Sequence, residues 1–245
     1  FFSDKWDIIA NFAAHKHVRS EKDKLSIEAL IKNNVFGAIK LLNLCSQLPP
    51  KNFFSVSTDK AANPVNIMGA SKSLMEKIIL SKKDDFRVST ARFANVAFSN
   101  GSLLDGFVKR IGKNQPLSCP SNIKRFFVSP LQSGQICLLA TFLGKTGYIF
   151  FPKLDFHKDQ IFFKEIALSF LKENGFNPVI FNSEADAKNY DSNRNKPDYP
   201  VFLFKSDTSG EKEYEEFYTF DEDYDLDSYD SVGYITSSEI NISFT

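Results

Sequence analysis

The sequence has 245 residues, of which 42% are hydrophobic and 24% are charged. These proportions are ordinary for a soluble globular protein, and the length is sufficient to bury a substantial core. The longest apolar runs, such as residues 136–140, are too short to cross a bilayer, and we recognise no signal peptide. The three cysteines are odd in number and lack CxxC spacing, which favours a reducing, cytoplasmic setting and argues against a structural zinc site.

The net charge of zero conceals an uneven distribution. From residue 206 onward there are 12 acidic residues against one lysine, whereas the first 205 residues carry 29 Lys and Arg against 18 Asp and Glu. A basic body suits phosphorylated ligands, although a solvated basic surface is an equally good interpretation. The acidic stretch 211–230 contains six aromatic residues, so we expect a tail that docks on a surface rather than a purely disordered one.

The first hundred residues alternate between strand and helix patterns. Residues 6–13 predict a buried parallel strand, and a helical spacing of apolar residues follows from 26 to 48, where Pro49 and Pro50 end it. Further strands are predicted at 52–57 and 87–93, with a helix between them that runs to about residue 82. Strand, helix, strand, helix, strand at this spacing is typical of a parallel, doubly wound sheet.

Beyond residue 100 the pattern changes to that of a smaller mixed α/β region. Helices are predicted at 103–112, 131–143 and 162–174, and short strands at 148–151, 179–181 and 201–204. We therefore expect three regions: residues 1–100 with the sheet and a catalytic segment, residues 101–210 for substrate binding, and an acidic, aromatic-rich tail at 211–245.

One element of a dinucleotide-binding domain is missing from the sequence. Such domains open with a strand, a Gly-rich turn and a helix whose N-terminus holds the pyrophosphate, yet no GxGxxG or GxxGxxG occurs. Either the fold is of another type, or the chain lacks the first half of such a domain. Because the chain begins inside a predicted strand, the second interpretation is favoured.

A hydroxyl, a carboxylate and an amine stand in succession at the end of the second predicted strand, as Thr58, Asp59 and Lys60. Open α/β sheets bind their ligands at this end of their strands, although a turn followed by a helix cap would use the same residue types. Lys72 follows 14 residues after Thr58 on the next helix. In short-chain dehydrogenase/reductases, a Ser or Thr at a strand end is followed by Tyr-x-x-x-Lys on the next helix, where both helix residues share one face.

Seven short motifs occur in a fixed order along the chain. They are FAAHKHV at 12–18, NVFG at 34–37, STDKAANPVNIMGASK at 57–72, RFANV at 92–96, NGS at 100–102, KRFF at 124–127 and GYIFFPKL at 147–154. Each is weak alone, but the ordered set resembles the CapD-like polysaccharide-biosynthesis group, which are nucleotide-sugar 4,6-dehydratases of the extended short-chain dehydrogenase/reductase superfamily. The resemblance is strong over about residues 7–154 and looser to residue 216, where SGEK at 209–212 resembles a late GEK element.

The resemblance implies a Rossmann-like doubly wound parallel sheet without its first half, and a smaller mixed α/β substrate region. It implies NADP or NAD as the cofactor, with contacts from Ala13, Ala14, Lys16, Asn34, Ser57 and Lys72. It also implies nucleotide-sugar contacts from Lys16, Asn95, Ser102, Arg125 and Lys153. The alternatives are turn or cap roles for the Asn and Ser, and surface positions for the basic residues. His15 and His17 lack a third ligand at metal spacing, so we expect no metal site.

The resemblance also implies a reaction. Oxidation at sugar C4 passes a hydride to the cofactor, and the hydride later returns to C6. In between, Lys60 removes the C5 proton, Asp59 protonates the departing C6 hydroxyl, and Thr58 hydrogen-bonds the C4 oxygen. These roles need a neutral Lys60 and a protonated Asp59, whereas adjacent opposite charges favour the ionised forms. A closed site with bound substrate therefore becomes necessary.

Met68 stands where most short-chain enzymes have the Tyr that takes the C4 hydroxyl proton. A thioether cannot act as a base, although some members of the group resembled also carry Met here. The first deprotonation is then open between Lys60 serving twice and a water held by Lys72. A degenerate, non-catalytic homologue is the third interpretation.

We therefore predict a truncated UDP-N-acetylglucosamine-type 4,6-dehydratase of surface-polysaccharide or nonulosonic-acid biosynthesis. The full-length protein is expected to be cytoplasmic or membrane-anchored, homo-oligomeric, and without a nucleic-acid partner. The alternatives are a nucleotide-sugar epimerase on the same fold, and a non-catalytic fragment that binds nucleotide sugars.

Overall fold

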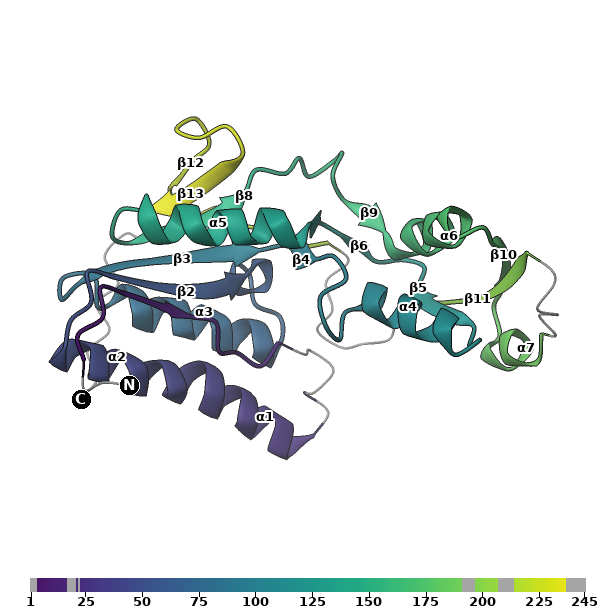
Figure 1. The fold of residues 1–245 in the computed structure, drawn as a ribbon, viewed down its shortest axis with the longest axis horizontal. Coiled ribbons are helices and arrows are strands. Elements are labelled where there is room, and N and C mark those ends of the chain that lie inside the picture. Colours follow the sequence, from purple (N-terminus) through teal and green to yellow (C-terminus); the bar gives the residue numbers. More distant parts are fainter. Residues whose placement is uncertain (1–3, 17–20, 22, 191–196, 207–213, 237–245) are drawn as a thin grey trace.

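The computed structural model describes residues 4–16, 21, 23–190, 197–206 and 214–236, which form a large lobe and a small lobe (Figure 1). The large lobe is built on a six-stranded sheet with the order β1-β2-β3-β8-β13-β12. No helix within the described ranges is long and apolar enough to cross a membrane.

The first four strands of this sheet are parallel, and each is followed along the chain by a return connection. They are β1 (Ile8–Asn11), β2 (Asn52–Thr58), β3 (Arg87–Phe93) and β8 (Tyr148–Pro152). Helices α1 (Lys24–Ile31), α2 (Gly37–Gln47) and α3 (Ile67–Leu80) cover one face, and α5 (Pro130–Phe142) covers the other (Figure 1). This arrangement confirms the predicted doubly wound parallel sheet.

The core lies on both faces of the sheet because neighbouring strand residues point in opposite directions. Phe53 of β2 packs into the cluster formed with α2 and α3, and Phe54 packs into the cluster formed with α5. Both phenyl rings are fully buried. A strand buried on both faces needs consecutive apolar residues, which is why the sequence pattern located β2 correctly.

The helix predicted at 26–48 is interrupted by a π-helical turn, η2 (Lys32–Phe36). A π-turn inserts one extra residue into a helix and is often found at functional sites. Here it carries Asn34, which is fully buried next to α3. The hydrophobic spacing could not reveal this turn, because it displaces the apolar stripe by a single position.

The small lobe has its own three-stranded parallel sheet with the order β10-β11-β5. Its strands are β5 (Leu117–Pro120), β10 (Asn177–Phe181) and β11 (Asp198–Phe204), and its helices are α4 (Leu103–Gly112), α6 (Phe163–Glu173) and α7 (Glu184–Asn189). Two short strand pairs lie between the lobes (Figure 1). They are β4 (Asn95–Val96) with β7 (Phe127–Val128), and β6 (Lys124–Arg125) with β9 (Ile161–Phe162).

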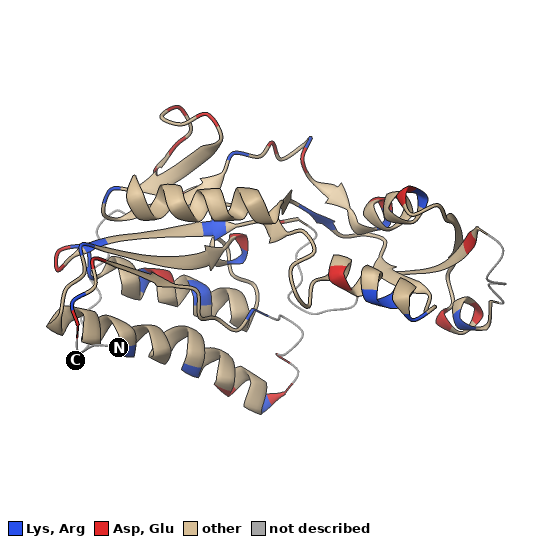
Figure 2. Ribbon diagram, in the orientation of Figure 1, with Lys and Arg blue, Asp and Glu red and all other residues tan. Residues whose placement is uncertain are grey.

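The main sheet crosses the region boundaries expected from the sequence at residues 100 and 210. It takes β8 from the expected substrate region, and β12 (Tyr224–Asp225) and β13 (Val232–Thr236) from the expected tail. Strand β13 runs antiparallel to β8, and the rings of Tyr148 and Tyr234 stack with centroids 4.2 Å apart. The described part of the acidic segment thus docks on the chain's own sheet, with acidic residues on its hairpin (Figure 2).

A buried arginine anchors the start of this segment. The Arg92 guanidinium, on β3, donates to Glu76 Oε2 of α3 at 2.9 Å and to Glu222 Oε1 at 2.7 Å. It also donates to the carbonyl oxygen of Phe217 at 2.9 Å. Although burial opposes the charge, the two carboxylates raise the pKa of Arg92 above its usual value. Arg92 therefore stays charged and joins β3, α3 and residues 217–222.

Substitution of this arginine should destabilise the fold strongly. Arg92→Met leaves the Glu76 carboxylate buried without its cation, so we expect the free energy of unfolding to fall by about 3–5 kcal/mol in urea denaturation. Lys82→Met is the control, because Lys82 pairs with Asp85 at the surface, and it should cost less than about 1 kcal/mol. Equal losses in the two variants would contradict the anchoring role.

Candidate active site

A cavity of about 370 Å³ opens at the C-terminal ends of the parallel strands, between the two lobes. Parallel α/β sheets bind ligands at this edge. Most of the residues selected from the sequence line this cavity together, although they come from five separate segments of the chain. They are Ala14, Lys16, Ser57, Thr58, Lys60, Met68, Lys72, Asn95 and Ser102.

Thr58, Asp59 and Lys60 converge on one carboxylate oxygen. Asp59 Oδ1 accepts from Thr58 Oγ1 at 2.8 Å, from the Lys60 backbone N–H at 2.9 Å and from Lys60 Nζ at 3.0 Å. Thr58 also caps the 3₁₀ turn η3 (Asp59–Ala61), so the cap interpretation of the sequence holds for the backbone. Thr58 and Lys60 line the cavity, while the Asp59 side chain is buried behind them and its Oδ2 has no hydrogen-bond partner among the described residues.

Lys60 also faces a carboxylate that the sequence did not indicate. Its Nζ lies 3.5 Å from Glu215 Oε1, and Arg125 Nε lies 3.7 Å from the same oxygen. Burial by itself would lower the pKa of the Lys60 ammonium, but the Asp59 and Glu215 carboxylates outweigh it and raise that pKa above its usual value. In the ligand-free site Lys60 is therefore a cation, and it must lose a proton before it can act as a base.

Lys72 and Met68 lie on α3 at the wall of the cavity. Lys72 Nζ donates to the carbonyl oxygen of Val56 at 2.6 Å. Burial lowers the pKa of Lys72 to about 8, although Glu76 one turn along opposes this shift. Met68 is buried and presents only its thioether, so the position that holds Tyr in most short-chain enzymes supplies no acid or base.

Gly69 allows α3 to approach the turn η3 closely. A Cβ atom at this position would lie 2.6 Å from the carbonyl oxygen of Lys60. Asn66 caps the helix one turn earlier by accepting from the Gly69 N–H at 2.8 Å. The cap and the missing side chain together place Met68 and Lys72 opposite the end of β2.

Asn34 supports the site from behind and does not line it. Its side-chain amide exchanges hydrogen bonds with the backbone of His15, at 2.8 and 3.0 Å, and donates to Ser71 Oγ at 2.9 Å. These bonds hold the segment after β1, where Ala14 and Lys16 reach the cavity and Lys16 Nζ donates to the Asn100 carbonyl at 2.9 Å. Ala13 is exposed outside the cavity, and His17 falls outside the described residues.

The selected residues after β3 divide between the cavity and other places. Asn95 and Ser102 line the cavity, and Ser102 also caps α4 by accepting from the Asp105 N–H at 3.2 Å. Arg125 is buried against Glu215, so it is neither a surface arginine nor part of the lining. Lys153 lies apart, in a separate cavity of about 680 Å³ beside α5, β8 and β13.

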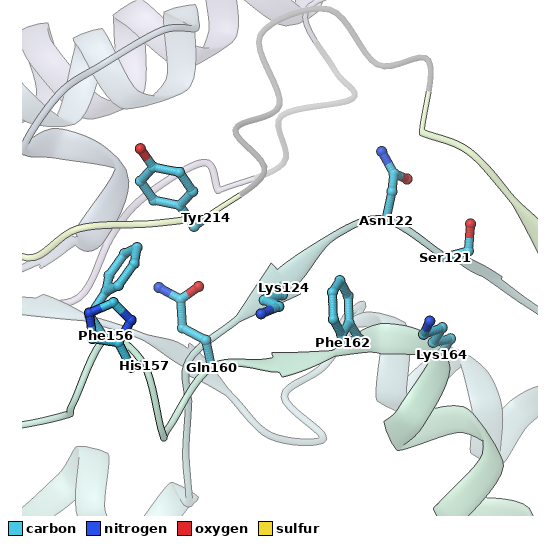
Figure 3. Close-up of a pocket in the computed structure, with 9 residues that line it drawn as sticks. All are labelled: Ser121, Asn122, Lys124, Phe156, His157, Gln160, Phe162, Lys164 and Tyr214. Atoms are coloured by element: carbon cyan, nitrogen blue, oxygen red, sulfur yellow. The ribbon is translucent and has the colours of Figure 1, made fainter.

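A further cavity of about 590 Å³ is lined by residues that include Lys124, Phe162, Lys164 and Tyr214 (Figure 3). Lys124 and Lys164 place their ammonium groups 4.6 and 4.9 Å from the centre of the Phe162 ring. Tyr214 lines the same cavity, whereas the next residue, Glu215, is buried and reaches Lys60. Consecutive residues of this segment thus reach the cavity and the turn η3, respectively.

Glu215 and Arg92 were not selected from the sequence. The only signals were the loose resemblance that reached residue 216 and the RFANV motif at 92–96. Neither signal shows a contact, because Glu215 meets Lys60 only after the acidic segment has folded back on the sheet. Within the described ranges, no group of three or more His, Cys, Asp and Glu side chains could hold a metal ion.

The close approach between Gly69 and the turn η3 can be tested by measuring the stability of the folded protein. Gly69→Ala should lower the free energy of unfolding by about 1–3 kcal/mol in urea denaturation, since its methyl group meets backbone that cannot move freely. Gly106→Ala is the matched control, because a Cβ there meets nothing within 4 Å. The free energy of unfolding of the control should rise by up to about 1 kcal/mol, because Ala has a higher helix propensity than Gly. A rise in the free energy of unfolding of Gly69→Ala would contradict the close approach.

Lys72 should make stability depend on pH in the alkaline range. The folded chain loses this proton near pH 8, whereas the unfolded chain keeps it to its ordinary pKa of 10.5. Between these values the unfolded state binds more protons, so stability rises with pH. Compared with Lys72→Met, the wild type should gain on the order of 3 kcal/mol across this window. Lys77→Met changes an exposed position of α3, so its free energy of unfolding should still rise with pH as in wild type. If the free energy of unfolding of wild type and Lys72→Met depended on pH in the same way, the lowered pKa of Lys72 would be refuted.

Several known proteins are similar to this chain in sequence. A UDP-N-acetylglucosamine 4,6-dehydratase (inverting) of Campylobacter jejuni is 33% identical over 158 residues, covering 60% of this chain and 46% of that protein. The capsular polysaccharide biosynthesis protein CapD of Staphylococcus aureus is 31% identical over 142 residues, covering 56% and 23%. A UDP-glucose 4-epimerase of Rickettsia canadensis is 35% identical over 130 residues, covering 50% and 38%. The chain thus spans less than half the length of these relatives.

Two solved structures match most of the chain. Pen from Bacillus thuringiensis superposes with a TM-score of 0.76 at 22% identity, covering 94% of this chain and 65% of that one. The dTDP-glucose 4,6-dehydratase DesIV of Streptomyces venezuelae, with NAD and TYD bound, gives 0.64 at 18% identity, covering 86% and 64%. Residues 1–236 also match the sequence profile of a family described as "Polysaccharide biosynthesis protein". The family resemblance seen in the ordered motifs is confirmed, and the chain belongs to this polysaccharide biosynthesis protein family.

Proposed function

We propose that this chain forms the catalytic part of a nucleotide-sugar 4,6-dehydratase, with UDP-N-acetylglucosamine or a similar nucleotide N-acetylhexosamine as substrate. The observation that carries the proposal is the Asp59–Lys60 pair, with Thr58, at the cavity between the lobes. A dehydratase needs one base and one acid close together, because it removes a proton and a hydroxyl from adjacent carbons. The Campylobacter jejuni relative, named for this reaction, supports the choice.

The cofactor in this proposal is NADP or NAD, since DesIV, of the same fold, was solved with NAD bound. When bound, the cofactor would accept the hydride from C4 and return it to C6. Ser57, Lys72 and Lys16 are the polar residues that would hold it, and the buried Ser57 hydroxyl has no protein hydrogen-bond partner among the described residues. The chain has no Gly-rich turn for the pyrophosphate, so we expect it to bind the cofactor weakly by itself.

The Asp59–Lys60 hydrogen bond offers a route to the reactive protonation states. In the resting site Lys60 is an ammonium group, and Asp59 accepts from it at 3.0 Å. Transfer of one proton along this bond gives a neutral amine and a carboxylic acid together. Substrate that excludes water favours such an uncharged pair, because desolvation penalises both ions. Lys60 then removes the C5 proton, and Asp59 protonates the C6 hydroxyl, which leaves as water. When the hydride is returned to C6, Lys60 would give its proton back to C5.

Thr58 and Met68 are the residues expected beside C4 of the sugar. Thr58 lines the cavity, and its hydroxyl would donate to the C4 oxygen once it no longer donates to Asp59. Met68 contributes an apolar wall only, so the proton of the C4 hydroxyl must go to a water held by Lys72, or to Lys60, which would then have to release it before it removes the C5 proton. The pKa of Lys72, lowered to about 8, suits a group that passes protons near neutral pH.

The nearest alternative is a nucleotide-sugar epimerase, because a Rickettsia canadensis relative carries that name. An epimerase leaves the C6 hydroxyl in place, whereas a dehydratase product has a methyl group at C6, so NMR of the product separates the two. A non-catalytic binding module would show thermal stabilisation by the nucleotide sugar without any product. The cytoplasmic location and homo-oligomeric state of the full-length protein stay predictions.

Substitution of Lys60 tests the proposed function directly. In the full-length protein with UDP-N-acetylglucosamine and NADP or NAD, Lys60→Ala should lower the rate of 4-keto-6-deoxy product formation by about 10²–10⁴-fold, because the C5 base is lost. Product is measured by NMR, and Lys77→Ala, at an exposed position of α3, should act like wild type. An unchanged rate in Lys60→Ala would refute the assignment.

A further inference from the structure

Three buried side chains and the partly exposed Lys60 form a line of alternating charge that begins at the cavity. Asp59 meets Lys60 at 3.0 Å, Lys60 meets Glu215 at 3.5 Å, and Glu215 meets Arg125 at 3.7 Å. Their side chains are 1%, 17%, 3% and 3% exposed, in that order. Buried charges are costly unless they are paired, and in this line each charge has an opposite neighbour. The function proposed above uses only the first two members.

Glu215 is held in this line by contacts of its own backbone and of the two residues that follow it. Its carbonyl oxygen accepts from Gln160 Nε2 at 3.3 Å, and the neighbouring Glu216 carboxylate accepts from Asn63 Nδ2 at 2.7 Å. Phe217 packs its ring 5.1 Å from that of Phe126 and accepts at its carbonyl from Arg92. The backbone is thus fixed at the next residue, and the Glu215 carboxylate cannot easily withdraw from Lys60.

Glu215 changes the balance between the ionised and the neutral form of the Asp59–Lys60 pair. With Asp59 alone, transfer of a proton from Lys60 would cancel one positive and one negative charge. With Glu215 also at 3.5 Å, the same transfer removes the cation that this second carboxylate faces. Arg125 opposes this effect only in part, because it lies beyond Glu215 and repels the ammonium group. The charged groups that act on Lys60 are therefore Asp59 from its own turn, Glu215 from the acidic segment and Arg125 from β6.

We propose that Glu215 is a positioning residue of the active site, which orients the Lys60 ammonium toward Asp59 and keeps one proton shared between them. The inference rests on the proposed function and deepens it. When Lys60 and Asp59 share one proton, the pair can provide the neutral amine and the carboxylic acid that the elimination needs. When that proton is lost, Asp59 has nothing to donate to the C6 hydroxyl. Glu215 thereby sets the upper pH at which the site can work.

The protonation of Lys60 is the first test, and it does not require turnover. The chain is labelled at lysine Cε with ¹³C, the Lys60 signal is assigned by its loss in Lys60→Arg, and its pKa is measured by NMR titration. Glu215→Gln should shift the pKa of Lys60 downward, because one facing carboxylate is gone. The control Asp221→Asn removes a charge from an exposed position of the same segment and should leave it unchanged. An unchanged Lys60 pKa in folded Glu215→Gln would overturn the proposal.

Glu215→Asp serves if the Gln variant does not fold beside Arg125. It keeps the charge but shortens the side chain, so the carboxylate moves away from Lys60, and the pKa of Lys60 should again fall. A folded Glu215→Asp protein whose Lys60 titrates as in wild type would overturn the inference equally.

The pH profile of the full-length protein is the second test. With UDP-N-acetylglucosamine as substrate, Glu215→Gln should move the alkaline limb of kcat/KM to lower pH, since the shared proton is lost sooner. A purely structural Glu215 would lower the folded fraction and leave this limb in place, which would refute the positioning role. If wild type forms no 4-keto-6-deoxy product at all, the proposed dehydratase function fails, while the titration of Lys60 still decides the role of Glu215.

Discussion

The contact between Arg92 and the segment at 217–222 is the interaction on which most of the molecule depends. Arg92 joins Glu76 of α3 to Glu222 and to the Phe217 carbonyl, so a strand, a helix and the acidic segment share one buried cation. From this anchor the chain runs one way to β12 and β13, which complete the main sheet. It runs the other way to Glu215, which completes the charge balance around Lys60. A single desolvated ion cluster thus couples the fold to the site.

Two lysines of the cavity, Lys60 and Lys72, differ in their partners. Lys60 faces two carboxylates and holds its proton tightly, whereas Lys72 is buried on α3 with a carbonyl oxygen for its partner. Their pKa values are displaced in opposite directions, because paired charge outweighs burial at Lys60 and burial outweighs charge at Lys72. Two groups of the same type can then take different roles in one cavity. Met68 lies between them in the sequence and supplies neither an acid nor a base to the cavity.

The segments that follow β3 contribute walls to the cavity. Asn95 and Ser102 enter the cavity from the segments that connect the two lobes, and Ser102 caps α4 there. Lys153 was expected at the substrate but lies in the separate cavity beside α5, β8 and β13. Strand β8 belongs to the main sheet.

The amino-acid sequence alone determined the parallel strands, the ends of most helices and the Thr58-Asp59-Lys60 turn. Apolar runs, caps and prolines act over a few residues, so their meaning can be read without the rest of the chain. The ordered motifs likewise determined the family. Only the tertiary structure decided that the acidic segment forms the edge of the main sheet, that a π-turn places Asn34 behind the site, and that Glu215 faces Lys60. These features depend on contacts between distant segments, which arise when buried charges must find partners and which no local pattern of residues encodes.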